Sequence, residues 1–102
     1  MMKRILKLMY IRLLFGKLAK KIVQEFSFES MIITSKYSVV LEISNKSDLE
    51  IFLRYDISYD AIEVIIFKGY EVKQVVFPIK NIKNDTILNW LKESFLEMLI
   101  GD

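Results

Sequence analysis

The chain of 102 residues has no cysteine and no histidine, and only three glycines and one proline. Without cysteine it can form neither disulfides nor thiolate metal sites, and the absence points to a reducing compartment. Without either residue type, the usual zinc sites, a cysteine nucleophile and an imidazole general base are all excluded. Any catalysis would have to rest on carboxylates, lysine, tyrosine or serine.

Long apolar runs are missing as well. A membrane-spanning helix needs about 18 consecutive residues with few or no charges, and the sequence contains no such stretch. The opening Met-Met-Lys-Arg resembles the start of a secretory signal, but Lys7 and Arg12 interrupt the apolar run behind it and no small-residue cleavage site follows. We therefore expect neither a transmembrane segment nor a signal peptide.

The low glycine and proline content also leaves no segment with the composition of a flexible linker. Hydrophobic residues make up 53% of the chain and charged residues 27%, which is typical of a protein that folds throughout. Single domains commonly run to about 100 to 150 residues. We predict one domain over residues 1–102.

Acidic residues are absent from the first quarter of the chain. Residues 1–24 hold seven lysines and arginines and no acid, whereas the rest of the chain holds 8 basic and 13 acidic residues. The simplest interpretation is that a basic element packs against an acidic body within the fold. The alternative is a basic surface that attracts an anionic partner.

Residues 61–79 carry two β-branched runs that are separated by Lys68-Gly69, a pattern that predicts a β-hairpin. A two-residue turn there would place Phe67 opposite Tyr70. Both faces of this hairpin carry large apolar side chains, and a two-stranded ribbon of that kind is not stable alone in water. We expect other strands and helices to cover it.

Two further stretches have strand patterns. Residues 27–34 and 37–43 predict a second hairpin around Ser35-Lys36, and residues 49–59 place an apolar side chain at every odd position. A competing signal is the capping-box pattern from Ser47 to Glu50, which would begin a short helix. We favour a strand for 49–59, because strict alternation is the primary signal.

Residues 4–23 predict a helix with an apolar stripe for burial, formed by Leu8, Ile11, Phe15, Leu18, Ala19 and Ile22 and continued by Phe26. A second apolar group, Leu6, Met9, Leu13 and Leu14, projects outside that stripe. The N-terminal half of the helix is therefore apolar nearly all round, and it needs a second partner surface.

A C-terminal helix is predicted after the N-cap candidates of residues 84–86, with Gly101 as its stop signal. Its apolar stripe consists of Ile87, Leu88, Leu91, Phe95, Met98 and Leu99. Pro78 should lie near a strand end or on a sheet edge. The predicted fold class is α+β, an antiparallel sheet of four to five strands with helices from both ends of the chain packed on it.

An internal repeat is a further hypothesis. With an offset of 33, residues 32–39 align with residues 65–72 at four identities in eight positions. A duplicated hairpin-helix unit would comprise residues 27–57 and 60–100 behind the helix of residues 4–23, and it would favour a short helix over 47–55. The alternative explanation is the shared composition of β-hairpins.

In lacking His and Cys, and in having 15 Ile and 12 Lys in a compact chain, the sequence resembles the small orphan proteins of viruses that infect hyperthermophilic archaea, of the Acidianus filamentous virus type. The resemblance covers the whole chain and rests on composition and layout. It implies a viral protein located in the host cytoplasm. It implies no particular activity.

One residue pattern could carry chemistry. Asp60 followed by Glu71-Val-Lys73 resembles the metal-binding acid and Glu-x-Lys of restriction-type nucleases, in which two carboxylates hold a divalent metal. The pattern is short, and the strand expected after the last helix is missing. A metal-dependent nuclease is therefore a remote alternative, and we predict that the protein is not an enzyme and has no metal or cofactor.

Two binding functions remain. The first and preferred one is a protein-protein interaction module, with an interaction surface at Leu6, Met9, Leu13 and Leu14, which binds a peptide or partner chain in a groove or at a sheet edge, or pairs with itself as a homodimer. The second is binding of nucleic acid or an anionic membrane surface through Lys3, Arg4, Lys7, Lys17, Lys20 and Lys21.

Overall fold

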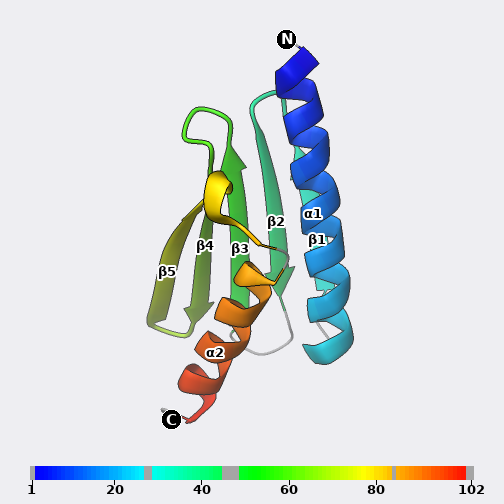
Figure 1. Ribbon diagram of the computed structural model, residues 1–102. Coiled ribbons are helices and arrows are strands. Elements are labelled where there is room, and N and C mark those ends of the chain that lie inside the picture. Colours follow the sequence, from blue (N-terminus) through cyan, green and yellow to red (C-terminus); the bar gives the residue numbers. More distant parts are fainter. Residues whose placement is uncertain (1, 27–28, 45–48, 84, 101–102) are drawn as a thin grey trace.

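The computed structural model describes residues 2–26, 29–44, 49–83 and 85–100. In chain order the elements are α1 (Met2–Phe26), β1 (Glu29–Thr34), β2 (Ser38–Ser44), β3 (Leu49–Asp56), β4 (Ala61–Lys68), β5 (Glu71–Pro78), a 3-10 turn η1 (Ile79–Asn81) and α2 (Thr86–Ile100). The predicted α+β class, with a helix from each end of the chain and a five-stranded antiparallel sheet, is confirmed (Figure 1).

The sheet is a meander whose spatial order, β1-β2-β3-β4-β5, is the order of the sequence. All four strand pairs are antiparallel, as short connections require. The β1–β2 turn is held by Ser35, whose backbone N–H donates to the Ser38 carbonyl at 2.9 Å and whose hydroxyl accepts from the Ser38 N–H at 3.1 Å. Pro78 ends β5, an edge strand, as predicted.

The preferred strand over residues 49–59 is confirmed for residues 49–56, where β3 pairs with both β2 and β4. The competing helix over 47–55 is wrong across the described residues 49–55, and Ser47 lies outside them. The strand ends earlier than predicted, at Asp56, because the chain turns back toward β4 there. Tyr59 is consequently 80% exposed rather than on the buried face.

The register of the β4–β5 hairpin differs from the prediction. The turn residues are Gly69 and Tyr70, so that Lys68 lies opposite Glu71 and Phe67 opposite Val72. Gly69 has a φ of 59°, and Tyr70 is not among the residues with positive φ. Glycine at the first central position is the requirement of a type II′ turn, whereas the predicted register placed Gly69 second.

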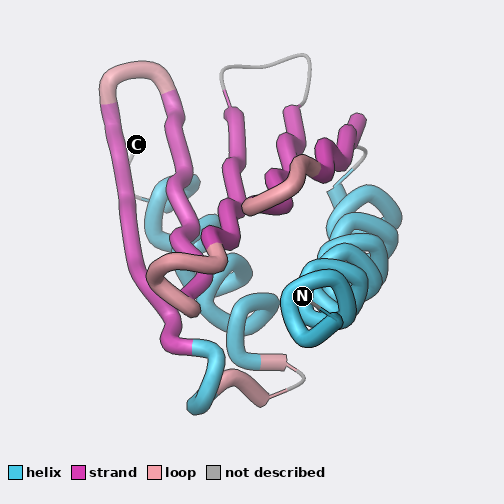
Figure 2. The backbone as a smooth tube through the Cα atoms, turned by 90° about the horizontal axis from the view of Figure 1, so that it is seen from above, coloured by secondary structure: helices cyan, strands magenta, loops and turns pink. Residues whose placement is uncertain are grey.

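The hydrophobic core lies between one face of the sheet and the two helices, which cover that face together (Figure 2). Its fully buried strand residues are Val39, Leu41, Ile43, Ile51, Leu53, Tyr55, Ile62, Val64 and Ile66. The predicted stripe of α1 is buried from Leu8 to Ile22, and Ile87, Leu88, Leu91 and Phe95 of α2 are buried as well. The side chains of Phe26, Met98 and Leu99 lie outside the described residues, as does Gly101.

The start of α2 follows from its capping pattern. The Asn89 N–H donates to the Asp85 carbonyl at 2.9 Å, which is the first i to i−4 bond of the helix and makes Asp85 the N-cap residue. Thr86 adds a hydroxyl that accepts from the Lys83 N–H at 3.1 Å. Asn84, another predicted cap, lies outside the described residues.

The predicted repeat units differ in structure. The first contains three strands, β1 to β3, whereas the second contains two strands and a helix. Matched residues also lie on opposite faces: Ile32 pairs with buried Leu41, but its counterpart Ile65 pairs with exposed Gln74. Residues that the offset of 33 aligns, such as Ile32 and Ile65, therefore lie on opposite faces of the sheet. The sequence match does not correspond to equivalent positions in the core.

Candidate interaction surfaces

Helix α1 exposes a second apolar surface, outside its buried stripe. Leu6, Met9 and Leu13 are 63%, 57% and 66% exposed, whereas Leu14 is half-buried against the core. Ile5 and Tyr10 are exposed too and were not among the predicted residues. Their spacing from Leu6, Met9 and Leu13 on the helix could have identified them. Single exposed apolar residues are common, but several of them on one helix surface are typical of an interaction site.

A groove of about 500 Å³ runs between α1 and strand β1. Its apolar lining consists of Met9, Leu13, Gly16 and Ile32, and its basic lining of Arg12, Lys17 and Lys20. A Cβ atom at Gly16 would meet nothing within 4 Å, so the helix surface is open at this point. The groove therefore combines apolar walls with positive charge.

Strand β1, which borders this groove, is an edge of the sheet. Among the described strands it pairs only with β2, and all of its residues except Ile32 are exposed. An edge strand offers backbone N–H and C=O groups to another extended chain. The groove and the edge lie side by side on the molecule, because Ile32 belongs to both.

The predicted basic residues are divided between paired and exposed positions. Lys7 forms an ion pair with Asp60 at 2.5 Å and Lys21 one with Asp85 at 3.6 Å. Lys17 and Lys20 are exposed and line the groove. The side chains of Lys3 and Arg4 lie outside the described residues. Part of the basic segment thus contacts acidic residues of the same molecule, as the simplest interpretation of the charge pattern requires.

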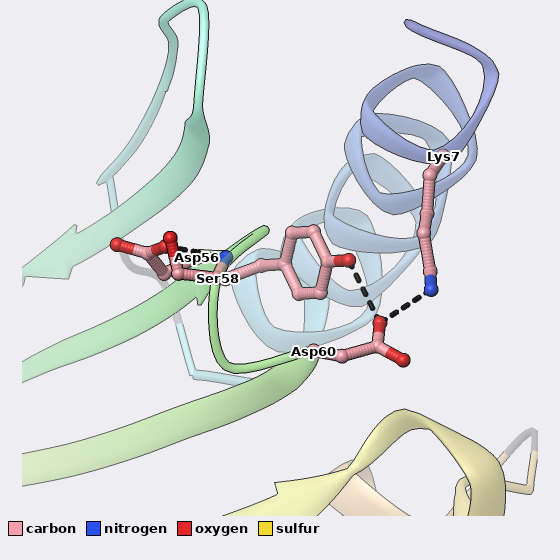
Figure 3. Close-up of polar contacts among 5 residues, drawn as sticks. Lys7, Asp56, Ser58 and Asp60 are labelled. Atoms are coloured by element: carbon pink, nitrogen blue, oxygen red, sulfur yellow. Dashed lines mark hydrogen bonds and ion pairs between the residues drawn. The ribbon is translucent and has the colours of Figure 1, made fainter. Parts of the chain in front are cut away.

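The Lys7–Asp60 pair is part of a small polar cluster where the β3–β4 turn contacts α1 (Figure 3). The Tyr55 hydroxyl donates to the same Asp60 oxygen at 2.9 Å. The hydrogen bonds from Lys7 and Tyr55 lower the pKa of Asp60, and burial, followed by the bond to Asp60, raises the pKa of Tyr55. Asp60 has a φ of 49°, a left-handed conformation that aspartate tolerates better than most residues.

This cluster joins α1 to the β3–β4 turn and contains one residue of the nuclease-like pattern, Asp60. Asp60 lies in the turn just before β4, whereas Glu71 pairs with Lys68 at the far end of that strand. Eight strand residues span roughly 25 Å. Lys73 forms an ion pair with Glu97 of α2. The residues of the nuclease-like pattern are therefore not brought together, and the described residues contain no group of acids that could hold a metal ion.

The second surface is the outer face of the sheet, opposite the helices; no described segment covers it. Its centre is a hollow of about 300 Å³ with apolar walls formed by Val40, Phe52, Ile65 and Phe67. The rings of Phe52 and Phe67 meet edge to face at 5.7 Å. The expectation that other elements cover both faces of the residue 61–79 hairpin holds for one face of the described structure only.

Acidic side chains surround this apolar centre. The register places five carboxylates on the outer face, those of Glu29, Glu42, Glu50, Asp56 and Glu63. Its one described arginine, Arg54, bonds to Glu63 at 3.1 Å, and Gln74 donates to the other oxygen of Glu63 at 2.7 Å. The outer face is thus apolar at the centre and acidic around it, the opposite charge to that of α1.

No family model matches the chain, and neither the curated proteins nor the solved structures that were compared with it contain a match. The resemblance to archaeal virus proteins therefore stays a prediction. Among the described helices, none has the length and apolar character that crossing a membrane requires. The fold and the surfaces define the chain as a helix-covered antiparallel meander with a basic groove and an acidic face that no described segment covers.

Proposed function

We propose that the protein is a non-enzymatic interaction module that captures an extended segment of a partner protein along strand β1. The observation that carries the proposal is the apolar groove beside a sheet edge. A segment that adds to β1 would gain backbone hydrogen bonds from the edge. Its alternate side chains would fill the groove between Met9, Leu13 and Ile32.

The charge of the groove selects the partner. Arg12, Lys17 and Lys20 line it, and the first 24 residues contain no acid. A segment that alternates apolar and acidic residues would meet both the apolar walls and the positive charges. Specificity would come from the side chains, while the backbone bonds would contribute to affinity for any extended chain.

A screen of a peptide library, with equal numbers of acidic, neutral and basic members, tests this function. Acidic-apolar peptides should bind, and Met9→Glu should weaken binding at least tenfold. Val72→Glu is the matched control, because Val72 is also 57% exposed but lies on β5, away from the groove. Absence of any binding peptide, or equal loss in both variants, would contradict the proposal.

The second candidate function is binding of nucleic acid or an anionic membrane surface, and the exposed Lys17 and Lys20 favour it. Such binding would fall steeply with added salt, since it depends on release of counterions or on screened attraction. Undetectable affinity for DNA, RNA and anionic vesicles at about 50 mM salt, where these contacts are strong, would eliminate it.

A further inference from the structure

The outer sheet face exposes large apolar side chains on both edge strands. Val72 and Val76 on β5 are 57% and 53% exposed, and Met31 and Ile33 on β1 are 53% and 46% exposed. They flank the hollow that Phe52 lines. A sheet with one covered and one solvated face normally has polar residues on the solvated side. This face instead has apolar side chains at its centre and on both edge strands, among its acidic residues, and such apolar groups are typical of a surface that packs against another layer.

The outer face is unsuited to pairing with itself. In a symmetric contact, the acidic surround of one copy, which includes Glu42 and Glu50, would meet the acidic surround of the second copy. The same argument applies to α1, whose basic residues would face each other without an acid from the first 24 residues between them. Like charges brought together at an interface oppose association.

The complementary surface lies on α1. Leu6, Tyr10, Leu13 and Lys17 occupy positions i, i+4, i+7 and i+11 of the helix and form a straight ridge on its exposed side, which we call the α1 ridge. Leu6, Tyr10 and Leu13 are exposed by 63%, 59% and 66%. The α1 ridge is apolar along its first two turns and basic beyond them.

We infer that the outer sheet face of one molecule binds the α1 ridge of a second copy. Leu6, Tyr10 and Leu13 would cover the hollow at the sheet centre, and Lys17 would meet the surrounding carboxylates. The contact would add a helix to the uncovered face and complete a helix-sheet-helix arrangement, in which both faces of the sheet are packed. In this pairing an apolar, basic surface meets an apolar, acidic one. The two symmetric pairings, outer face with outer face and α1 with α1, would bring like charges together.

The contact cannot be reciprocal. Helix α1, which carries the ridge, lies on the covered side of the sheet, and the outer face is the other side of the same sheet (Figure 2). A molecule that gives its ridge to one neighbour must therefore offer its outer face to another. Such a head-to-tail contact produces an open chain or a ring of several copies rather than a closed dimer.

This inference goes beyond the proposed function, because it adds the outer sheet face and names its occupant, although the α1 ridge shares Leu13 and Lys17 with the groove. Leu6 and Tyr10 belong to the α1 ridge but do not line the groove beside β1. The variant Leu6→Glu/Tyr10→Glu should therefore lose self-association but keep peptide binding. Met9→Glu tests the groove separately, so that the two ideas can fail independently.

Two variants, each with one damaged surface, test the contact by mixing. Leu6→Glu/Tyr10→Glu damages the ridge and leaves the outer face intact, whereas Glu42→Lys/Glu50→Lys reverses charge on the outer face and leaves the ridge intact. Sedimentation velocity at about 10 to 200 µM in low salt should show that the wild type forms species larger than a dimer. Each variant alone should be monomeric, and the mixture should form a complex of one chain of each.

Circular dichroism melts of both variants control for folding, since all four substituted residues lie outside the core. Phe52→Ser is a second outer-face variant, which removes the apolar centre and keeps every charge of that face. It should be monomeric alone and should form a complex only when it is mixed with Leu6→Glu/Tyr10→Glu. Raising the salt to about 1 M, where the Debye length falls to about 3 Å, should weaken the complex.

Three results would overturn the inference: a monomeric wild type at 200 µM in low salt, a mixture that stays monomeric, or a variant that still self-associates like the wild type. Binding of an unrelated basic amphipathic helix to the outer face of a monomeric wild type would likewise overturn the second copy as the occupant. None of these results would contradict the proposal that a peptide binds in the groove.

Discussion

The two faces of the sheet are built from the same strands but differ in what covers them. On β3, Ile51, Leu53 and Tyr55 are fully buried beneath the helices, while the alternating residues Phe52 and Arg54 line the hollow of the outer face. Apolar residues occur on both faces. Apolar composition therefore identifies surface that requires a partner, but it does not show whether that partner is part of the same chain.

Helix α1 likewise has one side that is covered and one that is exposed, with apolar residues on both. Its covered side contributes Ile11 and Phe15 to the core, and its exposed side carries Leu6 and Leu13. The covered surfaces should determine the free energy of unfolding, and the exposed ones should determine association. Substitutions on the two faces, and at the contacts that join the covered face to α1, should distinguish these two roles.

The largest effect is expected from Leu53→Ala, at the centre of the covered face. Leu53 is fully buried, and truncation of such a residue removes apolar burial and leaves a cavity. We expect a loss of about 3 kcal/mol in the free energy of unfolding. The neighbouring Phe52→Ala, on the outer face, should cost about 1 kcal/mol. Urea titration of both variants measures the difference, and equal losses would show that both faces stabilise the monomer alike.

The division between the faces could be predicted only in part from the sequence. The alternation of Leu49, Ile51, Leu53 and Tyr55 correctly predicted β3, and the stripe of α1 was correct wherever its side chains are described. These predictions succeeded because a period of two or of 3.6 residues directly reflects one-sided burial. The exposed Leu6 and Leu13 were predicted by the same logic.

Register and tertiary cover were harder to predict. The predicted turn, Lys68-Gly69, lies one residue before the observed turn, Gly69-Tyr70. The sequence did not distinguish them because both primed turn types accept glycine, at different positions. Ile65 and Phe67 were assigned to a covered hairpin, since a local pattern does not reveal how many layers the chain can supply. The basic groove depends on Ile32 lying beside Met9, a contact between distant segments that no local pattern contains.

A moderate effect is expected where the covered face is joined to α1. Tyr55→Phe keeps the buried ring but removes the hydroxyl that donates to Asp60 at 2.9 Å. We expect a loss of about 1 kcal/mol in the free energy of unfolding, the usual contribution of one hydrogen bond. Urea titration is again the measurement. An unchanged stability would mean that Lys7 alone is sufficient to hold Asp60.

Asp60 should make this junction dependent on pH. Its pKa is lower in the folded protein than in the unfolded chain, because Lys7 and Tyr55 donate to the carboxylate. Its contribution to stability is therefore present above the unfolded pKa of about 4 and is lost as pH falls through the folded pKa. Asp60→Asn, which also tolerates positive φ, should be less stable than the wild type at pH 7, and the gap should close below pH 4. A gap that persists at low pH would contradict this assignment.

The smallest effect on stability is expected from Val76→Thr on the outer face. Val76 is 53% exposed, and threonine keeps the β-branched shape that suits a strand. The free energy of unfolding should change by no more than about 0.5 kcal/mol. The same substitution at Val64, which is fully buried on the covered face of β4, should cost about 2 kcal/mol because a hydroxyl would be buried without an assigned partner.

This matched pair separates the two faces with one chemical change. If the outer face binds the α1 ridge of a second copy, Val76→Thr should weaken self-association in sedimentation experiments although the monomer is as stable as the wild type. Val64→Thr should destabilise the monomer and leave the association of the folded protein unchanged, since Val64 faces the helices. The opposite result, with Val76→Thr destabilising the monomer by as much as Val64→Thr, would mean that the outer face is covered within the molecule, and the comparison of the two faces would no longer hold.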